Sequence, residues 1–212
     1  MHTFIELPVF SRFADDYFTE EELADLKTAI ASDPAVGDVV PGTHGVRKLR
    51  WKRQGTGKRG GVRVLYYVQD AQGRIWLLTV YAKSARENIA ASTLNALRER
   101  LPTMPKLSEP QLPARDAKRD LNAELLESID LIKAGQLGRV SVVAADGRIV
   151  ESPIARVRIA SRLSPNQFAD LLGVSVQTLR AWEQGEGEPA GAVKTLLRMA
   201  ERHPDVLREL AE

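Results

Sequence analysis

Basic residues are concentrated between Val46 and Val68, and no acidic residue lies between Asp38 and Asp70. Cations gathered without carboxylates nearby repel one another unless a polyanion such as a phosphate backbone neutralises them. The residue types therefore predict either contact with a polyanion, which could be a phosphate backbone or an acidic partner, or a surface that faces water. The basic cluster comprises Arg47, Lys48, Arg50, Lys52, Arg53, Lys58, Arg59 and Arg63.

These cations lie in a sequence that alternates between apolar and basic residues. The stretch KLRWK alternates in this way, and a second alternating run begins at Val62 after a glycine-rich connection. A period of two on both sides of such a connection predicts a β-hairpin. Because residues two apart in a strand share a face, we expect Lys48, Arg50 and Lys52 to stand together.

The connection between the two strands contains glycines spaced as in a nucleotide-binding loop. Gly55, Gly57 and Gly60 match the pattern GxGxxG. That fingerprint must open a helix, whereas a strand-like sequence follows here, and Arg59 stands where a phosphate loop needs Ser or Thr. We therefore expect no nucleotide cofactor. The glycines are expected to permit positive φ in a wide hairpin loop.

The composition limits the class of protein. The chain has 212 residues, enough for two small domains, and its hydrophobic content of 43% is ordinary for a soluble protein. It has no Cys, and its three His residues are scattered, so no metal site is expected. No apolar run approaches the length of a membrane span, so we expect a cytoplasmic protein without membrane contact.

The first hundred residues predict a small α+β domain. Thr19 and Glu22 have the spacing of a capping box at the start of a helix. The order of elements predicts an antiparallel meander with helices on one face. The expected elements are a strand at 3–7, helices at 10–18 and 19–32, the basic hairpin, a central strand at 74–82 and a helix at 84–101.

The motifs KLRW, GxGKRGGxRVLYY and IWLLTVYAKS resemble the RelE superfamily of bacterial toxins, particularly its HigB-like branch, over nearly all of residues 1–101. The resemblance implies a metal-independent endoribonuclease that enters the ribosomal A site and cuts mRNA. By matching motif positions, it implies that the functional cations are Arg50, Lys52, Arg63 and Lys83. Many relatives have a late general base where this chain has Ile89.

The chemistry implied by this resemblance is attack of a ribose 2′-hydroxyl on the adjacent phosphate. It needs a base, cations for the developing charge and an acid for the leaving oxygen. Arg63 suits phosphate clamping, because its guanidinium is always charged and can bind two oxygens. Lys52 is the candidate base, because neighbouring cations disfavour its protonated form. The candidate RNA-binding residues are Lys48, Lys58, Arg59 and Tyr81, with Tyr81 and Tyr67 as stacking candidates unless they are core residues.

Four prolines between Leu101 and Ala114 predict an extended linker at residues 102–117. Beyond it, Asp120 is a candidate cap for an apolar-striped helix at 121–134, and two short strands with a turn are expected within 138–150. One helix and a hairpin cannot bury such a stripe alone. We therefore expect residues 118–151 to pack on the first domain, within one chain or exchanged between two.

The last part of the chain predicts a succession of short capped helices. The string LSPNQFADLLGVSVQTLRAWEQG resembles the helix-turn-helix of Cro/phage-repressor-like regulators, so an all-α fold is expected at 152–212. Gln177 and Arg180 lie three apart, near the start of a helix whose side chains can reach base edges, whereas Gln167 and Ser175 are expected to contact phosphates. The predicted DNA-binding set is Gln167, Ser175, Gln177, Thr178 and Arg180, and the predicted core is Ala169, Leu172, Val174, Leu179 and Trp182.

The segment KRDLNAELLESIDLIKAGQLGRV before the helix-turn-helix resembles HigA/MqsA-class antitoxins over about residues 117–210. We interpret the chain as a toxin and its antitoxin in one polypeptide, joined naturally or by design. The implied partners are mRNA on the ribosome, operator DNA bound by a homodimer, and the chain's own toxin half. The alternative is a transcriptional regulator with a catalytically degenerate RelE-like module.

Overall fold

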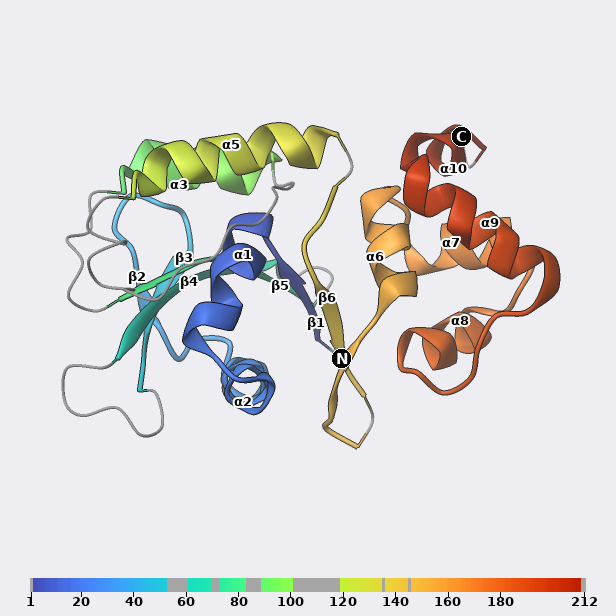
Figure 1. Cartoon of the computed structure of the whole chain (residues 1–212), viewed down its shortest axis with the longest axis horizontal. Helices are drawn as coiled ribbons and strands as arrows, with labels where there is room; N and C mark the ends of the chain where they lie inside the picture. Colours follow the sequence, from blue (N-terminus) through green and yellow to red (C-terminus); the bar gives the residue numbers. More distant parts are fainter. Residues whose placement is uncertain are drawn as a thin grey trace. The chain divides into compact units, whose positions relative to one another are not determined.

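The computed structural model describes residues 2–52, 61–69, 73–82, 89–100, 119–134, 136–144 and 146–210 (Figure 1). The chain forms two compact units, residues 2–138 and residues 139–212. The first is a mixed sheet with helices, and the second has a short hairpin followed by helices. This confirms the predicted α+β domain followed by a helical helix-turn-helix domain.

The sheet of the first unit is an antiparallel meander with one parallel strand added. Strands β2 (Asp38–Val39), β3 (Val46–Trp51), β4 (Val62–Gln69) and β5 (Arg74–Ala82) pair in that order, each antiparallel to the next. Strand β1 (Thr3–Glu6) pairs with β5 in parallel. The meander was predicted, whereas the short β2 and the parallel pairing of β1 were not.

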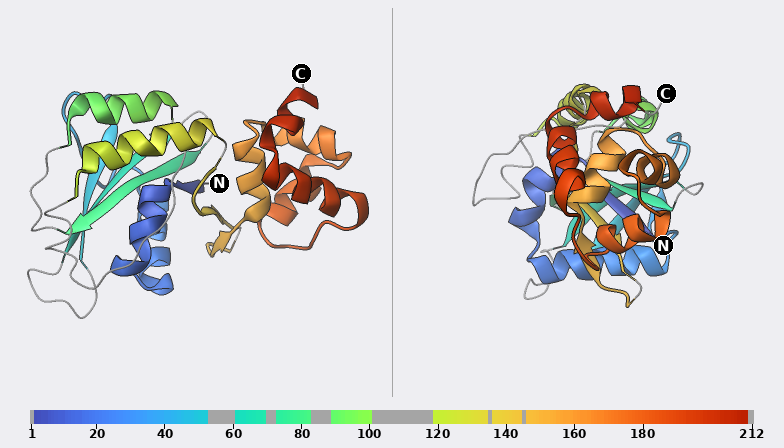
Figure 2. Two further views of the ribbon diagram at one scale, coloured as in Figure 1. Left: turned by 45° about the horizontal axis from the view of Figure 1, so that its top comes forward. Right: turned by 90° about the vertical axis from the view of Figure 1, so that its right-hand side faces the viewer.

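Helices cover both faces of this sheet. Helices α3 (Ala91–Arg100) and α5 (Leu121–Lys133) lie side by side along one face, and α1 (Pro8–Tyr17) and α2 (Glu20–Ser32) lie on the other (Figures 1 and 2). Every residue of β5 from Ile75 to Ala82 is buried. The prediction of helices on one face was therefore wrong, because a strand that is apolar on both sides needs cover on both sides.

The predicted caps form at two helices of this unit. Thr19 and Glu22 make a capping box, in which Thr19 Oγ1 accepts from Glu22 N at 3.2 Å and Glu22 Oε2 accepts from Thr19 N at 3.0 Å. Asp120 caps α5 by accepting from two backbone N–H groups. The final helix of the predicted α+β domain begins at Ala91. Ile89 was expected inside this helix but precedes it. Residues 84–88, which were also expected to be helical, lie outside the described residues.

The second unit contains a short hairpin and a helical domain. Among its described residues, no helix is long and apolar enough to cross a membrane, and the same holds for the first unit. Its elements are β6 (Val140–Val143), β7 (Ile149–Glu151), α6 (Pro153–Ala160), α7 (Pro165–Leu172), α8 (Val176–Glu183), α9 (Gly191–Arg202) and α10 (Pro204–Leu210).

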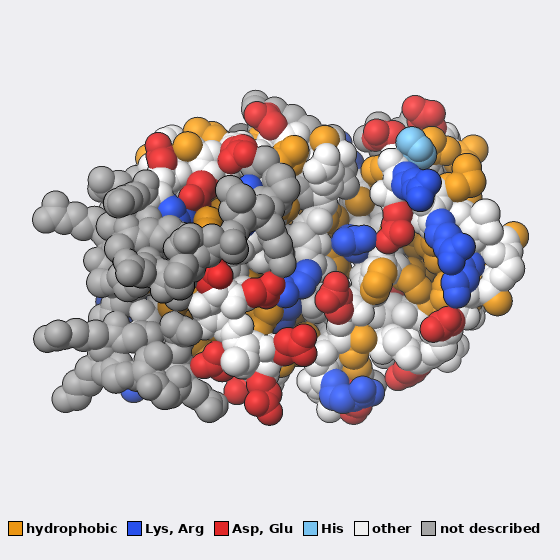
Figure 3. Space-filling model, viewed as in Figure 1, with side chains coloured by type: hydrophobic (Ala, Val, Ile, Leu, Met, Phe, Trp, Pro, Cys, Tyr) orange, Lys and Arg blue, Asp and Glu red, His pale blue; other side chains and the backbone are white. Residues whose placement is uncertain are grey.

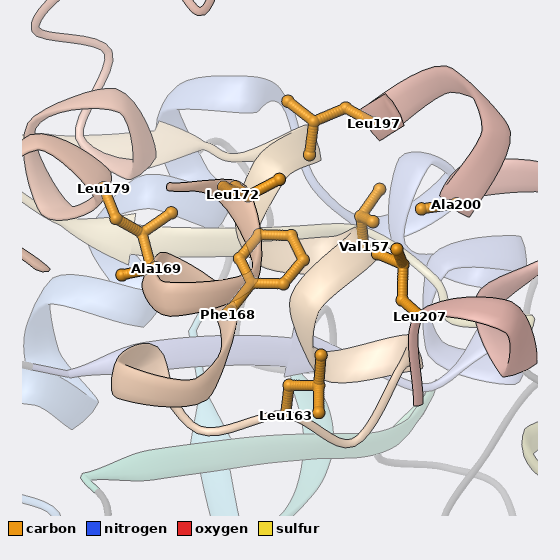
Figure 4. Packing of buried hydrophobic residues seen from close by; sticks show 9 residues of the cluster. All are labelled: Val157, Leu163, Phe168, Ala169, Leu172, Leu179, Leu197, Ala200 and Leu207. Carbon is orange, nitrogen blue, oxygen red and sulfur yellow. The ribbon is translucent and has the colours of Figure 1, made fainter. Parts of the chain in front are cut away.

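The helical core of the second unit is arranged around Phe168, which is fully buried (Figure 4). The predicted core residues Ala169, Leu172 and Leu179 are buried with it. Val174 is half-buried and packs against this cluster, and Trp182 is also half-buried. The prediction that Trp182 is a core residue was therefore only partly right. Phe168 was missed, although it lies next to Ala169 in the same helix.

Candidate nucleic-acid interfaces

Two arginines of the sheet lie directly opposite each other. The register pairs Arg50 of β3 with Arg63 of β4, and Arg63 with Tyr81 of β5. Partners in antiparallel register share a face, with Cβ atoms about 5 Å apart. Arg50 is exposed and Arg63 is half-buried. Within the described part of the chain, neither guanidinium forms an ion pair or hydrogen bond with a carboxylate.

The other predicted cations of the sheet differ in their surroundings. Lys52 follows the end of β3 and is exposed, and no ion pair to it is found among the described residues. Lys48 is half-buried and lies opposite Asp38 of β2 in the register. The remaining predicted site residues of this half, Lys58, Arg59 and Lys83, lie outside the described residues.

The tyrosine expected to stack on a base lies in the core. Tyr81 is 1% exposed, because both faces of β5 are covered. A ring in this position cannot stack on RNA without leaving the core, so Tyr81 does not belong to the accessible site, and the alternative core assignment fits the structure. Tyr67 is half-buried near the other end of β4.

Arg47, a member of the basic cluster, has a structural role that the sequence did not reveal. Its Nη1 donates to the carbonyl oxygens of Ala35 and Gly37 at 2.8 and 2.7 Å. The hydroxyl of Tyr66 donates to Pro34 O at 3.0 Å and accepts from Gly37 N at 3.1 Å. Burial raises the pKa of Tyr66, partly offset by the Gly37 N–H. Both side chains fix the loop before β2, so Arg47 is part of the scaffold.

The acidic residues of the first unit described below lie over α2 or inside the unit. Figure 3 shows acidic side chains gathered over α2, whose first turn contains three glutamates. Glu6 is completely buried, where Lys27 Nζ lies 2.9 Å from one of its oxygens and Ser11 Oγ donates to the other at 2.7 Å. These carboxylates are thus exposed over a helix or neutralised inside the unit, and none of them pairs with Arg50 or Arg63.

In the second unit, α7, a left-handed glycine turn and α8 form the predicted helix-turn-helix. Gly173 has φ +67° at the end of α7, a conformation that favours glycine. Gln177 and Arg180 are exposed on α8, three residues apart. They are the side chains available to reach base edges.

The other predicted DNA-binding residues also stabilise the ends of the two helices. Ser175 Oγ accepts from Thr178 N at 3.0 Å and lies 2.8 Å from Thr178 Oγ1. Gln167 Oε1 accepts from Ser164 N at 3.0 Å, which completes a capping box at the start of α7. Gln167 is exposed, and the oxygen of its side-chain amide is the atom used in this cap.

A buried ion pair between α6 and α8 was not predicted. Arg158 Nε lies 2.6 Å from Glu183 Oε1, and Arg158 Nη2 lies 3.1 Å from Oε2. The two side chains are 8% and 5% exposed. This two-bond geometry fixes the end of α8 against α6. An arginine within the apolar sequence of α6 was the available signal, because such a residue needs a buried acid.

Comparison with known proteins assigns each half. The profile of the RelE toxin of the RelE/RelB toxin–antitoxin system matches residues 7–123. The chain belongs to the RelE toxin family. A helix-turn-helix family profile matches residues 154–201. Antitoxin HigA-2 of Vibrio cholerae serotype O1 is 36% identical over 102 residues, which cover 45% of this chain and 98% of that protein. This RelE-family chain is therefore a toxin–antitoxin fusion with a DNA-binding helix-turn-helix domain.

Proposed function

We propose that the RelE-like half is a ribosome-dependent mRNA endoribonuclease, and that the tethered antitoxin half neutralises it and represses its own operon. The observation that carries the nuclease assignment is the Arg50–Arg63 pair. Two opposed arginines destabilise a sheet by several tenths of a kcal/mol unless an anion lies between them. An RNA phosphate is such an anion, and it matches the forked geometry of guanidinium groups.

Each cation has a separate role in the proposed cleavage. Arg63, half-buried between Arg50 and Tyr81, clamps the scissile phosphate and stabilises the charge that develops on it. Arg50 contributes a second positive charge from the facing strand. Lys52, exposed at the end of β3, is the proposed base for the 2′-hydroxyl. Lys83 completes the set by family resemblance.

The antitoxin half would bind an operator through α7 and α8. Gln177 and Arg180 are proposed to contact base edges, with Arg180 suited to guanine and Gln177 to adenine. Ser175, Thr178 and Gln167 are proposed to hold phosphates from the turn and from the start of α7. These contacts place α8 in the major groove, which is the usual docking of this motif.

A homodimer would bind an inverted-repeat operator. Met199, Val206 and Leu210 are 56%, 45% and 64% exposed on α9 and α10. Figure 3 shows hydrophobic side chains interspersed with Lys and Arg over these helices. Pairing of this surface around a two-fold axis would present two recognition helices. Light scattering of the Leu210→Lys variant should show a monomer where the unaltered chain is a dimer.

The test of the proposed nuclease is expression of residues 1–101, of the same segment with Arg63→Ala, and of the full chain. Residues 1–101 should arrest growth and translation, and the Arg63→Ala segment should not. The full chain should be harmless, because tethering gives the inhibitor an effective concentration in the millimolar range. If residues 1–101 accumulate as folded protein without arrest, the degenerate-module alternative is favoured instead.

A further inference from the structure

Arg119 lies beyond the Pro-rich stretch, yet its side chain is buried in the first unit. It is 5% exposed, and its guanidinium carbon lies 3.7 Å from the centre of the Phe13 ring of α1. Nε and Nη2 donate to both carboxylate oxygens of Glu124 at 2.6–3.0 Å. Glu124 is in the first turn of α5, so the charge of Arg119 is neutralised by the helix that it precedes.

The same guanidinium binds the sheet beyond the end of β1. The last pair of β1 with β5 is Glu6 with Leu77. Three residues further along β5, Arg119 Nη1 donates to Val80 O at 3.1 Å, and Nη2 lies 3.5 Å from Thr79 Oγ1. Arg119 therefore supplies a donor to β5 past the last residue that β1 pairs with. The acceptor Val80 is the residue just before Tyr81, the register partner of Arg63.

A second side chain of the same turn caps α3. Asn122 Oδ1 accepts from Ala90 N at 2.9 Å. Ala90 O accepts from the N–H groups of Thr93 and Leu94, so Ala90 is the residue that directly precedes α3 and accepts its first hydrogen bonds. An N–H at the start of a helix has no partner within the helix, and Asn122 supplies one. One turn of chain thus contacts β5, α1 and the start of α3.

We propose that Arg119 and Asn122, at the end of the stretch matched by the RelE profile, form the anchor through which the segment beginning at Arg119 holds the rest of the first unit, and that Phe13, Thr79, Val80 and Ala90 form the surface that it recognises. The anchor fits a segment with Arg and Asn three residues apart at the start of a helix. In this structure the same chain supplies that segment. The claim that the anchor restrains the RNA site rests on the proposed function. The contact itself rests only on the distances given above.

Hydrogen exchange of the full chain, followed by mass spectrometry of peptides from α5 and α3, tests the anchor. Arg119→Ala should speed exchange in α5 about tenfold or more, because it removes charged hydrogen bonds from a buried site. Arg119→Lys keeps the charge but loses the fork, and should act in the same direction. Asn122→Ala should speed exchange at the start of α3. The matched control is Arg148→Ala, whose partner Asp146 forms an ion pair that is 72% and 53% exposed on the two sides.

Unchanged exchange in α5 and α3 for Arg119→Lys and Asn122→Ala would overturn the anchor, even if Arg119→Ala unfolds the unit. Cleavage of mRNA by the same variants separates this proposal from the proposed nuclease. Gain of cleavage in the anchor variants but not in Arg148→Ala supports the restraint. Faster exchange in α5 without cleavage keeps the anchor as a contact and counts against the nuclease.

Discussion

One arginine contact in each unit shows opposite uses of the same residue type. In the DNA-binding unit, Arg158 is 8% exposed, and its Nε and Nη2 donate to the two carboxylate oxygens of Glu183. In the toxin unit, Arg50 and Arg63 face each other across two strands, without a carboxylate among the described residues. Arg158 is neutralised by its ion pair with Glu183, which holds α8 to α6. No carboxylate in the part of the chain that the structure describes neutralises the sheet pair, so within that part its charge is available to a ligand.

The partners of each arginine in the structure distinguish structural cations from binding cations better than the sequence does. Arg47 and Arg50 are close neighbours in one basic run, yet Arg47 donates to backbone carbonyls whereas Arg50 is exposed. Arg119 resembles Arg158, because it is also buried and held by a glutamate. The difference lies in the partners and not in the residue type, and it predicts opposite effects of mutation on stability.

The largest effect on stability is expected from Glu183→Ala. Removal of the acid leaves Arg158 buried and unpaired, which should lower the free energy of unfolding of the second unit by about 3–5 kcal/mol. Thermal and urea unfolding of the full chain, with hydrogen exchange assigned to each unit, measure this loss. Replacement of the exposed Glu201, which pairs with Arg156 at the surface, should change stability by less than about 1 kcal/mol. Equal losses of stability on replacing Glu183 and Glu201 would refute the expected difference between the buried and the exposed ion pair.

The largest effect on activity is expected from Arg63→Ala. Loss of a positive charge directed at the transition state should lower the rate of mRNA cleavage by residues 1–101 about 10²–10³-fold. The free energy of unfolding should remain the same or rise, because a like-charge contact is removed. If Arg63→Ala is inactive only because it is unfolded, it will lose the cooperative unfolding transition measured by circular dichroism. That outcome would argue for a structural role of Arg63.

On the DNA side, Arg180→Ala should weaken binding to the specific operator by about 1–3 kcal/mol and relax sequence preference at one base pair. Gln167→Ala should weaken specific and non-specific binding alike, because phosphate contacts carry no sequence information. Titrations of operator and scrambled DNA by fluorescence anisotropy measure both quantities. The assignment of Arg180 fails if its replacement lowers both affinities equally.

The smallest predicted effect is the change in stability on replacing one arginine of the Arg50–Arg63 pair. Arg50→Thr replaces one of two opposed cations by a strand-forming residue, and should raise the stability of the first unit by about 0.2–1 kcal/mol. The same change in a buried, paired arginine would lower stability. Urea unfolding at low and high salt checks the sign, since screening should reduce the gain. A loss of stability at low salt would mean that Arg50 has a partner in the fold.

Local patterns predicted most of the fold because their signals are short-range. The capping boxes at Thr19 and Ser164, the turn glycine Gly173 and the bounds of β5 follow from neighbouring residues alone. The parallel pairing of β1 with β5 joins segments about seventy residues apart, and no local pattern specifies it. The cover on both faces of the sheet was missed because no local pattern specifies that α3 packs on the face opposite α1 and α2.

The candidate sites were predictable in residue type but not in role. Strand alternation indicated that Lys48, Arg50 and Lys52 share a face, yet the register was needed to show that Arg50 lies opposite Arg63 and Lys48 opposite Asp38. Tyr81 belongs to the same motif as the cations, but burial removes it from the accessible surface. The role of Arg119 was not predictable from local sequence, because only Glu124 is near it in the chain, whereas Phe13 and Val80 belong to two elements distant in sequence.

The central claim is that the uncompensated arginines of the sheet exist to hold RNA. Its most direct test is primer-extension mapping of one mRNA exposed to residues 1–101 in a translating extract, compared with the Arg50→Gln/Arg63→Gln variant of the same segment. We predict discrete cuts that need active ribosomes with the first protein and none with the second, although both have the same melting temperature within a few degrees. Cuts of equal intensity from the glutamine variant would contradict the claim.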